Sequence, residues 1–574
     1  MGQYDLSPFI RIEGYDEEIF AGYTAILTEL KRQTAGRKKA VILCEFYPGV
    51  DREEVVNALR ALNPVLIIDS EACARDEESL NRLFAHELTD DRVFGVITNK
   101  RLRDCFVPEK LAQAAEQTAA VSEGIVLLYG TGASLIAKGD LLLYFDMERW
   151  EIQKRYRKGM PNWHCTNTDA PDLSKYKRGF FIEWRMADIQ KKALFRQADY
   201  FVDTGTGGQP RMLTAKGFFA GIEAASRRPF RTVPYFDPGV WGGQWMKEKF
   251  GLEAAAGNYA WSFDGVPEEN SLQLEYGGVL FRQPCINLVF LKPHELLGER
   301  VHARFGTEFP IRFDLLDTMG GENLSLQVHP LTEYLQENFH MHYTQDESYY
   351  ILDAGPDACV YIGLKENIDP QEMAADLYRA QRGEISFPAD KYINRIPVKK
   401  HDHILIPAGT VHSAGKNTMV LEISATPYIF TFKLWDWDRL GLDGLPRPIH
   451  LEHGLPNIQW ERDLPWVQEN LLNRTELLSQ TANAKIERTG LHEREFIDVF
   501  RHSFTGCHRC ETKGSVNVLH LAEGEQVTVC SEAGSFPDFT VHYGETFIIP
   551  AAVDSFTLRT QDKSPVRVLQ AMVR

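Results

Sequence analysis

Apolar and polar side chains alternate strictly over residues 323–330 of this chain. A β-strand has a side-chain period of two, so the stretch predicts a strand with one dry face and one polar face. Ser325, Gln327 and His329 place a hydroxyl, an amide and an imidazole on the polar face. Such a row suits a metal or ligand site in a β-barrel, but a solvated outer strand shows the same alternation. The stretch alone leaves both interpretations open.

The length and charge of the chain limit its class. At 574 residues, we expect roughly three or four domains of about 150 residues each. A hydrophobic content of 44% with 25% charged residues is ordinary for globular protein, so large cores are available. The formal net charge of -17 argues against nucleic acid or an anionic membrane as a general partner.

The cysteines and the apolar runs predict the compartment. Nine cysteines are scattered along the chain, which fits reduced thiols better than a disulfide framework. The first residues show no basic stretch followed by an apolar run, so no signal peptide is expected. No stretch approaches 18 apolar residues, so no transmembrane helix is expected. These patterns predict a soluble, cytoplasmic protein.

The first two hundred residues alternate between buried-strand and helix patterns. An apolar run over residues 39–47 ends in a Pro-Gly turn, and the acidic residues Asp51, Glu53 and Glu54 then mark a helix start. Further strands are expected over residues 65–69, 93–98, 124–129 and 140–145. Strands that alternate with helices predict a parallel α/β sheet, here over residues 1–205.

The turn after the first strand is where a nucleotide kinase would place its phosphate loop, with glycines and a Lys followed by Ser or Thr. Here it reads Tyr47-Pro48-Gly49-Val50, without Gly-Lys-Ser. The order of later segments nevertheless resembles the nucleoside-kinase branch of P-loop proteins. The segments that carry this resemblance are residues 124–130, 140–146, 149–157 and 198–203. With the lysine missing, the resemblance implies a degenerate P-loop-like domain that is non-catalytic and binds, docks or dimerises; an active sugar or nucleoside kinase is the alternative.

Two nearby features have a plainer interpretation. Arg149, Arg155 and Arg157 could form the basic lid helix of such a kinase, but we favour a solvated basic face. Three glycines follow in residues 205–208, and a lone glycine cluster is weak evidence for a phosphate cradle. We therefore expect residues 206–234 to be a linker.

From residue 235 onward, short strand patterns, Gly/Pro turns and many aromatic residues predict β-barrels or jelly rolls. The motifs, in order, are Val240-Trp241-Gly242-Gly243, Gln327-Val328-His329-Pro330, Glu347-Ser348-Tyr349-Tyr350, Gly409-Thr410-Val411-His412-Ser413 and Trp435-Asp436-Trp437-Asp438-Arg439. In this order and spacing they resemble class I mannose-6-phosphate isomerases of the short bacterial type, which are zinc-dependent cupins. The resemblance covers residues 235–574.

This resemblance implies a metal site and a substrate site. The implied metal ligands are Gln327, His329, Glu347 and His412; the implied catalytic residues are Lys433 and Arg439; the implied substrate-binding residues are Ser325, Arg312 and Gln345. One amide, two imidazoles and one carboxylate suit zinc, with iron, nickel or manganese as substitutes. Taken singly, each ligand could equally be a strand end, a surface acid or a turn residue.

The substrate side departs from the family pattern. Gln345 and Asp314 stand where the family has lysines, Lys433 stands where it has an arginine, and the Gln that usually follows the Glu of the next strand is absent after Glu422. Loss of lysines removes charge-assisted contacts to a phosphate dianion, and lysine lacks the two-pronged geometry of arginine. The metal end is thus expected to be retained, while phosphate recognition is altered.

The C-terminal segment repeats part of the barrel. Residues 544–555 echo residues 402–413 with one deletion, and Asp554 stands where the metal histidine would be. We therefore expect a metal-binding cupin over residues 235–460 and a second cupin barrel without metal over residues 461–574. The CxxC of Cys507 and Cys510 precedes a β region and has no second CxxC, so it is interpreted as structural or incidental.

The sequence thus predicts a multidomain protein, an α/β parallel sheet followed by an all-β double cupin. The expected function is metal-dependent isomerisation of mannose 6-phosphate and fructose 6-phosphate through an enediol, with a small-molecule sugar or sugar phosphate as the partner. A different, unphosphorylated sugar is an alternative substrate. A non-catalytic, metal-containing sugar sensor is an alternative function.

Overall fold

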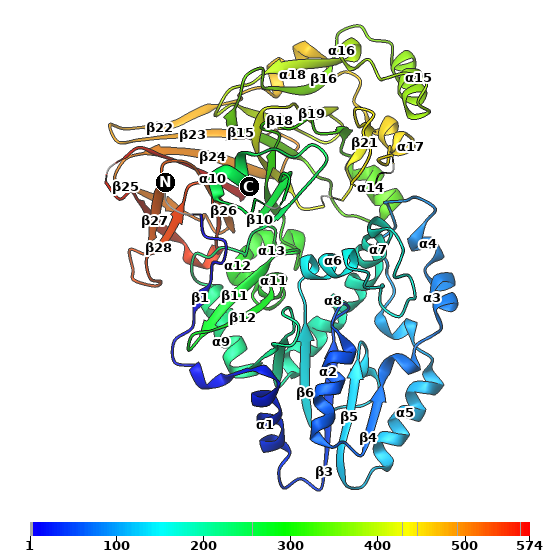
Figure 1. Ribbon diagram of the computed structural model, residues 1–574. Coiled ribbons are helices and arrows are strands. Elements are labelled where there is room, and N and C mark those ends of the chain that lie inside the picture. Colours follow the sequence, from blue (N-terminus) through cyan, green and yellow to red (C-terminus); the bar gives the residue numbers. More distant parts are fainter. Residues whose placement is uncertain are drawn as a thin grey trace. The chain divides into compact units, whose positions relative to one another are not determined.

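The computed structural model describes residues 4–574 apart from Ala255, Tyr428, Asp443, Leu445, Leu491 and Lys563. The chain divides into two compact units (Figure 1). The α/β unit comprises Phe9–Ala225 and Glu268–Leu291, and the β unit comprises the chain up to Pro8, Ser226–Pro267 and Lys292–Arg574. None of the described helices has the length and apolar character that a membrane crossing requires.

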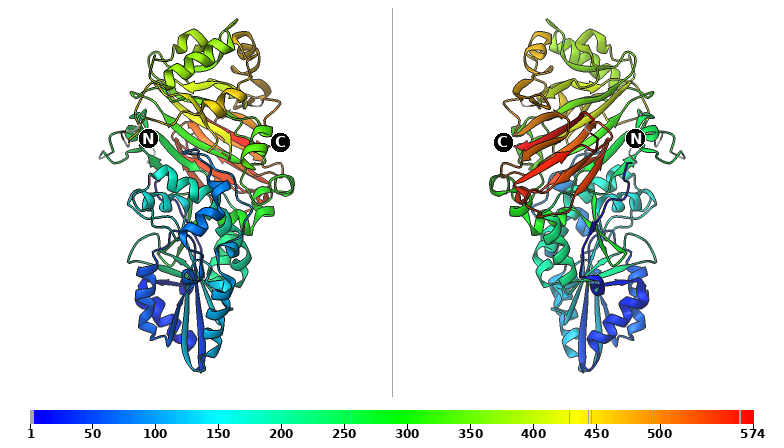
Figure 2. Two further views of the ribbon diagram at one scale, coloured as in Figure 1. Left: turned by 90° about the vertical axis from the view of Figure 1, so that its right-hand side faces the viewer. Right: turned by 90° about the vertical axis from the view of Figure 1, so that its left-hand side faces the viewer.

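The centre of the α/β unit is a seven-stranded sheet in the order β2-β8-β7-β6-β3-β5-β4. Its parallel strands are β3 (Lys39–Phe46), β4 (Leu66–Asp69), β5 (Gly124–Gly130), β6 (Leu141–Asp146) and β7 (Tyr200–Asp203). Helices lie on both faces of the sheet (Figure 2), among them α1 (Gly22–Thr34), α2 (Arg52–Leu59), α5 (Pro108–Ala120) and α8 (Trp184–Leu194). Strand β3 is buried along nearly its whole length, as a central parallel strand must be. The strands predicted over residues 65–69, 124–129 and 140–145 are confirmed.

The strand predicted over residues 93–98 is wrong. Phe94 and Val96 are buried, as the apolar run requires. The backbone amides, however, bond outside the sheet: Val96 donates to the Glu87 carbonyl at 2.9 Å and Thr98 donates to the Phe181 carbonyl at 3.0 Å. Burial of an apolar run can therefore be satisfied by an irregular segment whose amides find carbonyls elsewhere.

The linker predicted over residues 206–234 is wrong as well, because its middle belongs to the core of the α/β unit. Strand β8 (Arg211–Thr214) pairs antiparallel with both β7 and β2 (Ile19–Ala21). Helix α9 (Ala215–Ala225) follows directly. The glycine cluster marks the turn that reverses the chain between β7 and β8.

Residues 268–291, which we placed in the first cupin domain, belong to the α/β unit. Strand β11 (Ser271–Tyr276) pairs in parallel with β1 (Ile10–Arg11). The buried hydroxyl of Tyr276 donates to the carbonyl of Gly217 at 3.0 Å. The chain thus returns to its first unit after entering the second, and local turn residues cannot reveal such a return.

Two of the three arginines expected on a solvated face are engaged inside the fold. Arg149 is buried and donates to Asp188 at 2.7 Å. Arg155 donates to the carbonyl of Gly49 at 3.0 Å, closing the turn after β3. Only Arg157 of the three is exposed. The prediction of a solvated face is therefore wrong for Arg149 and Arg155.

The first barrel of the β unit has a six-stranded sheet, β18-β15-β20-β13-β10-β9, and a five-stranded sheet, β17-β16-β19-β14-β21. Their bounds are β9 (Tyr235–Asp237), β10 (Trp261–Gly265), β13 (Ile311–Asp317), β14 (Leu326–Val328), β15 (Glu347–Ala354), β16 (Cys359–Leu364), β17 (Ile393–Pro397), β18 (His403–Ile406), β19 (His412–Ala414), β20 (Thr418–Ala425) and β21 (Phe432–Trp435). Tyr349 and Ile351 from one sheet and Val360 and Ile362 from the other belong to one buried cluster. The core therefore lies between the two sheets.

A second pair of sheets follows, with orders β22-β23-β24-β31-β26-β29 and β25-β30-β27-β28. Their bounds are β22 (Glu476–Gln480), β23 (Ala484–Gly490), β24 (Ile497–Phe504), β25 (Cys507–Glu511), β26 (Asn517–Glu523), β27 (Gln526–Cys530), β28 (Phe539–His542), β29 (Thr546–Ile549), β30 (Ser555–Arg559) and β31 (Val566–Val573). The echo between residues 402–413 and 544–555 corresponds to the same strand-turn-strand succession, β18 to β19 and β29 to β30. Asp554, at the position of the metal histidine, is exposed.

A buried carboxyl gives the α/β unit a distinct pH dependence. Glu45, at the end of β3, accepts hydrogen bonds from the amides of Gly132 at 2.6 Å and Ser134 at 2.7 Å. Burial raises the pKa of Glu45 to about 7. The folded unit thus binds a proton that the unfolded chain releases, so its stability is expected to fall as pH rises from about 4.5 to 7, by about 3 kcal/mol.

Glu45→Gln is expected to remove about 3 kcal/mol of this pH dependence and to leave the part that comes from buried Glu148, whose pKa burial also raises to about 7. The exposed neighbour variant Glu53→Gln is expected to keep all of it. Pulse proteolysis in urea at pH 5 and pH 7.5, with the cleaved fragments assigned by mass spectrometry, measures the unfolding free energy of this unit. If the unfolding free energy changed with pH equally in Glu45→Gln and in the parent protein, the assignment to Glu45 would be contradicted.

Candidate metal centre

The strands of the first barrel bring the four predicted metal ligands together from opposite sheets. Gln327 on β14 lies directly opposite His412 on β19, and His329 follows at the end of β14. Glu347 begins β15 in the other sheet. The polar row of the opening stretch is not solvated, because Ser325, Gln327 and His329 are only 3%, 6% and 1% exposed. The interpretation of that stretch as a solvated outer strand is therefore wrong.

Glu347 lies between the two imidazoles. Its Oε1 is 2.8 Å from Nε2 of His412, and its Oε2 is 3.2 Å from Nε2 of His329. The side-chain nitrogen of Gln327 is 3.2 Å from Nε2 of His412. The ligand atoms of His329, Glu347 and His412 all lie within 4.8 Å of one another, so a single cation can contact all three.

Backbone carbonyls orient both imidazoles toward this point. Nδ1 of His412 is 2.9 Å from the carbonyl of Thr410, and Nδ1 of His329 is 3.4 Å from the carbonyl of Phe430. A carbonyl can only accept, so the proton of each ring is placed on Nδ1 and the lone pair on Nε2 faces Glu347. This is how outer partners fix metal-binding histidines.

The buried atoms at this point fit a divalent cation. Nε2 of His329 and Oε1 of Glu347 are buried and make no hydrogen bond of acceptable geometry with any residue that the structure describes. Burial raises the pKa of Glu347, but protons carried by His329 and His412 outweigh it and hold the pKa below its ordinary value, and a bound cation would take the place of those protons. A buried carboxylate beside two imidazole lone pairs needs a compensating positive charge. Two imidazoles and one carboxylate are ligands that zinc accepts.

Gln327 offers its side-chain amide to this point, and a hydrogen bond from Ser325 holds that amide. The Ser325 hydroxyl donates to the amide oxygen of Gln327 at 3.0 Å, which leaves the amide nitrogen toward His412. Only the oxygen can bind a cation, so metal binding by Gln327 requires the amide turned over. The serine hydroxyl can then accept from the amide nitrogen instead of donating. Ser325 is thus placed to position a ligand.

A layer of buried acids adjoins Glu347. Asp314 on β13 lies directly opposite Glu422 on β20, and Gln345 donates to Glu347 at 3.1 Å and to Glu422 at 3.0 Å. Burial, with Asp314 and Glu347 close by, raises the pKa of Glu422 well above its ordinary value. Burial also raises the pKa of Asp314, to about 6. Neighbouring carboxyls resist ionising together, so this layer favours a shared proton beside the candidate ligands.

Sequence reasoning did not select Glu422 as a site residue. The sequence does carry a signal for this residue, because Glu422 and Ser424 alternate with the apolar Leu421 and Ile423 along β20. That alternation places Glu422 and Ser424 on one face of the strand. Only the pairing of β20 between β13 and β15 shows that this face meets Glu347.

The predicted catalytic residues differ in placement. Lys433 on β21 lies directly opposite Gln327, so its side chain leaves the sheet on the same face as the ligand. Arg439 is bound by Asp436, three residues earlier, through its guanidinium and through the Asp436 carbonyl. Among the described contacts, none joins Arg439 to the four ligands. The structure therefore groups Lys433, but not Arg439, with the candidate centre.

Arg312, a predicted substrate-binding residue, lies against the acid layer. Its guanidinium stacks over the ring of Phe263, and its Nε is 3.6 Å from Oδ1 of Asp314. Arg312 is 5% exposed. Its charge partly compensates Asp314, and the pKa of Asp314 is raised by burial despite it.

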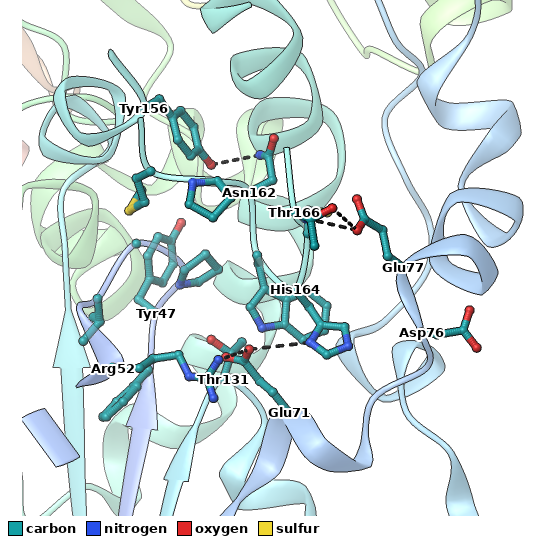
Figure 3. Close-up of a pocket in the computed structure, with 18 residues that line it drawn as sticks. Tyr47, Arg52, Glu71, Asp76, Glu77, Thr131, Tyr156, Asn162, His164 and Thr166 are labelled. Carbon is teal, nitrogen blue, oxygen red and sulfur yellow. Dashed lines mark hydrogen bonds and ion pairs between the residues drawn. The ribbon is translucent and has the colours of Figure 1, made fainter. Parts of the chain in front are cut away.

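The α/β unit contains a pocket of about 500 Å³ at the carboxyl ends of β3, β4 and β5 (Figure 3). The strand order reverses at β3, and ligands of open α/β sheets bind at such an edge. Arg52 donates to Asp69 and, at 2.6 Å, to Glu71, whose Oε2 is 3.7 Å from Nδ1 of His164. Among the described lining residues, no lysine is present.

Comparisons with known proteins match the two parts of the chain separately. Residues 22–227 match a family model described as a domain of unknown function, DUF8485. Mannose-6-phosphate isomerase ManA of Bacillus subtilis (strain 168) is 24% identical over 332 residues, which cover 58% of this chain and 95% of that protein. Mannose-6-phosphate isomerase of Streptococcus mutans is 24% identical over 328 residues, 55% of this chain and 90% of that protein.

Solved structures of mannose-6-phosphate isomerases also align with part of this chain. A crystal structure of the mannose 6-phosphate isomerase from Bacillus subtilis aligns with a TM-score of 0.48 and 20% identity, over 60% of this chain and 99% of that chain. A mutant of phosphomannose isomerase from Salmonella typhimurium aligns with a TM-score of 0.47 and 15% identity, over 60% of this chain and 99% of that chain. By sequence, homology to mannose-6-phosphate isomerases covers about 58% of the chain, in its C-terminal part.

Proposed function

We propose that the β unit is a metal-dependent isomerase that interconverts an aldose and a ketose, as mannose-6-phosphate isomerases do. The observation that carries the proposal is the convergence of His329, Glu347 and His412 from opposite sheets on one buried point. The homology with curated mannose-6-phosphate isomerases supports the same class. With Gln327 as the fourth ligand, zinc is the metal that we propose, with iron, nickel or manganese as substitutes.

The residues around the centre suit this chemistry. Isomerisation moves a proton between C1 and C2 of the sugar through an enediol(ate). A divalent metal, when bound, supplies stabilisation of the negative charge that develops on the sugar oxygens. In our proposal Glu422 holds the mobile proton, because burial and the adjacent acids raise its pKa. Lys433 adds positive charge on the ligand face, and Arg439 orders the loop after β21 through Asp436.

The substrate is proposed to differ from a simple hexose 6-phosphate. A phosphate dianion is best held by charge-assisted donors, but Gln345 and Asp314 supply an amide and a carboxyl. The buried guanidinium of Arg312 lies beside Asp314. We therefore propose a free sugar, or one that carries a different charged group, bound by Ser325, Arg312 and Gln345.

Deuterium exchange tests both the class and the substrate. The zinc-loaded full-length protein is incubated in deuterated water with mannose, fructose or their 6-phosphates, and NMR follows the C2 proton of the aldose, the C1 protons of the ketose and the product. Exchange at C2 of the aldose or at C1 of the ketose, with formation of the second sugar, supports the isomerase. Tight sugar binding without exchange would establish instead the sensor alternative, which Gln345 and Asp314 favour. Conversion of the 6-phosphates alone would refute the altered substrate.

Glu422→Gln tests the proton carrier. The amide keeps the shape of the side chain and a partner for Gln345 but has no acid proton, so the turnover number is expected to fall about 100-fold to 10,000-fold. Bound metal is expected to stay at the parent level, because Glu422 is not a ligand. Glu337→Gln, at an exposed position far along the chain from the acid layer, is the control and should change the rate little. An unchanged rate in Glu422→Gln would show that another group carries the proton.

For the α/β unit we propose a non-catalytic, binding role. Its pocket has the position of a ligand site but lacks the lysine that phosphate transfer requires, and Arg52 is already held by two carboxylates. Calorimetric titration of the full chain with Mg-ATP is expected to show no binding. Binding of ATP in the micromolar range would favour the kinase alternative.

A further inference from the structure

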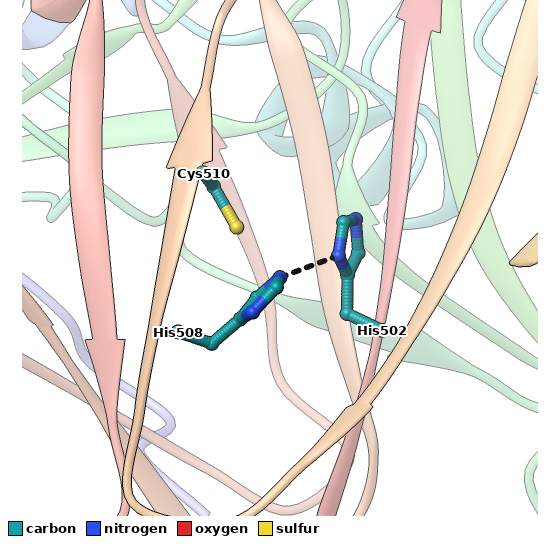
Figure 4. Close-up of side chains that lie close together, drawn as sticks. All are labelled: His502, His508 and Cys510. Atoms are coloured by element: carbon teal, nitrogen blue, oxygen red, sulfur yellow. Dashed lines mark hydrogen bonds between the residues drawn. The ribbon is translucent and has the colours of Figure 1, made fainter. Parts of the chain in front are cut away.

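Two imidazoles and one thiol meet inside the second barrel, away from the candidate centre described above. His502 is on β24 of the six-stranded sheet, whereas His508 and Cys510 are on β25 of the four-stranded sheet. Their side chains point toward one another (Figure 4), and Nδ1 or Nε2 of each histidine and Sγ of the cysteine all lie within 4.8 Å. The three residues are 6%, 9% and 5% exposed.

A chain of amide hydrogen bonds fixes the proton on His502. The side-chain nitrogen of Gln570 donates to Asn517 and to the carbonyl of Glu511, so its oxygen faces His502. That oxygen is 2.7 Å from Nε2 of His502, and an amide oxygen can only accept. Nε2 therefore carries the proton, and the Nδ1 lone pair points into the cluster, 2.9 Å from Nε2 of His508. Such an outer hydrogen bond is typical of metal-binding histidines.

The pattern of β25 explains the placement of the other two donors. Along Cys507–Glu511 the exposed and buried residues alternate, so His508 and Cys510 point into the barrel and Cys507 points out. The CxxC spacing is thus uninformative here, since its two cysteines lie on opposite faces. The pair that shares a face is His508 and Cys510.

We infer that His502, His508 and Cys510 form a second metal centre, which takes Zn²⁺ or another thiolate-binding divalent cation. Two imidazoles with one thiolate are borderline and soft ligands that select zinc and copper over magnesium or calcium. On binding, a metal–sulfur bond replaces the S–H bond of Cys510, and the thiol proton is released to water. His508 binds through Nε2 and keeps its proton on Nδ1. Three protein ligands leave a fourth position for water or a small ligand.

This centre differs from the one that we considered lost in the second barrel. That expectation rested on Asp554, which aligns with His412 and is exposed. The new cluster uses β24 and β25 instead, and its ligand set contains sulfur. The first centre contains none among Gln327, His329, Glu347 and His412, so the two are separable by spectroscopy.

Cobalt reconstitution tests the inference without reference to activity. The full-length protein is stripped of metal and titrated with Co²⁺, whose bonds to thiolate give a charge-transfer absorption in the near ultraviolet. We expect this absorption in the parent protein and in Glu347→Gln, which is altered only at the first centre. We expect it to vanish in Cys510→Ser and to persist in Cys507→Ser, the matched control on the same strand.

Zinc analysis of the same proteins gives an independent measurement. Two equivalents per chain are expected in the parent protein and in Cys507→Ser, and one in Cys510→Ser. His502→Gln, which keeps a polar partner for Gln570, should also lose one equivalent. Circular dichroism checks that each variant is folded. Absence of the charge-transfer band in the folded parent protein, or its persistence in Cys510→Ser, would overturn the inference and leave a hydrogen-bonded pair of histidines packed against a thiol.

Discussion

Glu347→Gln is expected to remove the metal of the first barrel and to lower the rate of isomerisation by at least about three orders of magnitude. Glu347 is the only acid among the four proposed ligands, and it lies 2.8 Å and 3.2 Å from the nitrogens of His412 and His329. Glutamine keeps its size but loses the negative charge that binds a dication. Metal-assisted charge stabilisation is worth several kcal/mol, which corresponds to a rate factor of about a thousand or more.

The measurement combines metal analysis with an isomerase assay on the same preparation. Glu337→Gln, at an exposed position of helix α14 (Thr332–Phe339), is the matched control and should retain both metal and activity. The proposed function would be wrong if Glu347→Gln kept both the metal content and the rate of the parent protein. Loss of activity with full metal content would instead point to Glu347 as a proton carrier.

Arg231→Leu is expected to cause the largest loss of stability in the β unit, about 3–5 kcal/mol. Arg231 is buried, 3.1 Å from Asp264 on β10 and 2.7 Å from Glu545, with its guanidinium over the ring of Tyr4. Removing it leaves two carboxyls buried without their cation. The pKa of Asp264 is already raised by burial, to about 6, while Arg231 is present.

Urea unfolding followed by tryptophan fluorescence measures this loss. Arg227→Leu is the control, because its ion pair with Glu295 is 4.0 Å long and the side chain of Arg227 is 55% exposed, so about 1 kcal/mol or less is expected. Combining Arg231→Leu with Asp264→Asn and Glu545→Gln should recover part of the stability, since no unpaired charge is then buried. A loss below about 1 kcal/mol for Arg231→Leu alone would show that water or local rearrangement compensates the carboxyls.

The candidate centre was predictable because it depends on strand periodicity. Alternation over residues 323–330 placed Gln327 and His329 on one face, and the motif around His412 supplied a second histidine. Their side-chain directions follow from a period of two and need no knowledge of strand order. Glu422 alternates equally clearly but was not selected, since its role depends on β20 lying between β13 and β15.

The predictions that proved wrong all concern residues whose partners are distant in the sequence. Residues 93–98 have the composition of a buried strand, yet their amides bond to Glu87 and Phe181. Residues 206–234 have the glycines of a linker, yet they contain β8, which pairs with the second strand of the chain. Arg149 and Arg155 have the pattern of a solvated face, yet their partners are Asp188 and Gly49. Each outcome is decided by a partner distant in sequence, which local pattern does not encode.

Local sequence pattern shows which strands carry donors, which face each donor occupies, and where lysines that would hold a phosphate are missing. Which donors meet depends instead on how the strands pair and how the sheets pack. Glu347 comes from one sheet and His412 from the other, and His502 and Cys510 likewise come from two different sheets. The physical reason is that a metal site needs atoms within a few ångströms of one point, and only the packing of two sheets face to face sets that distance.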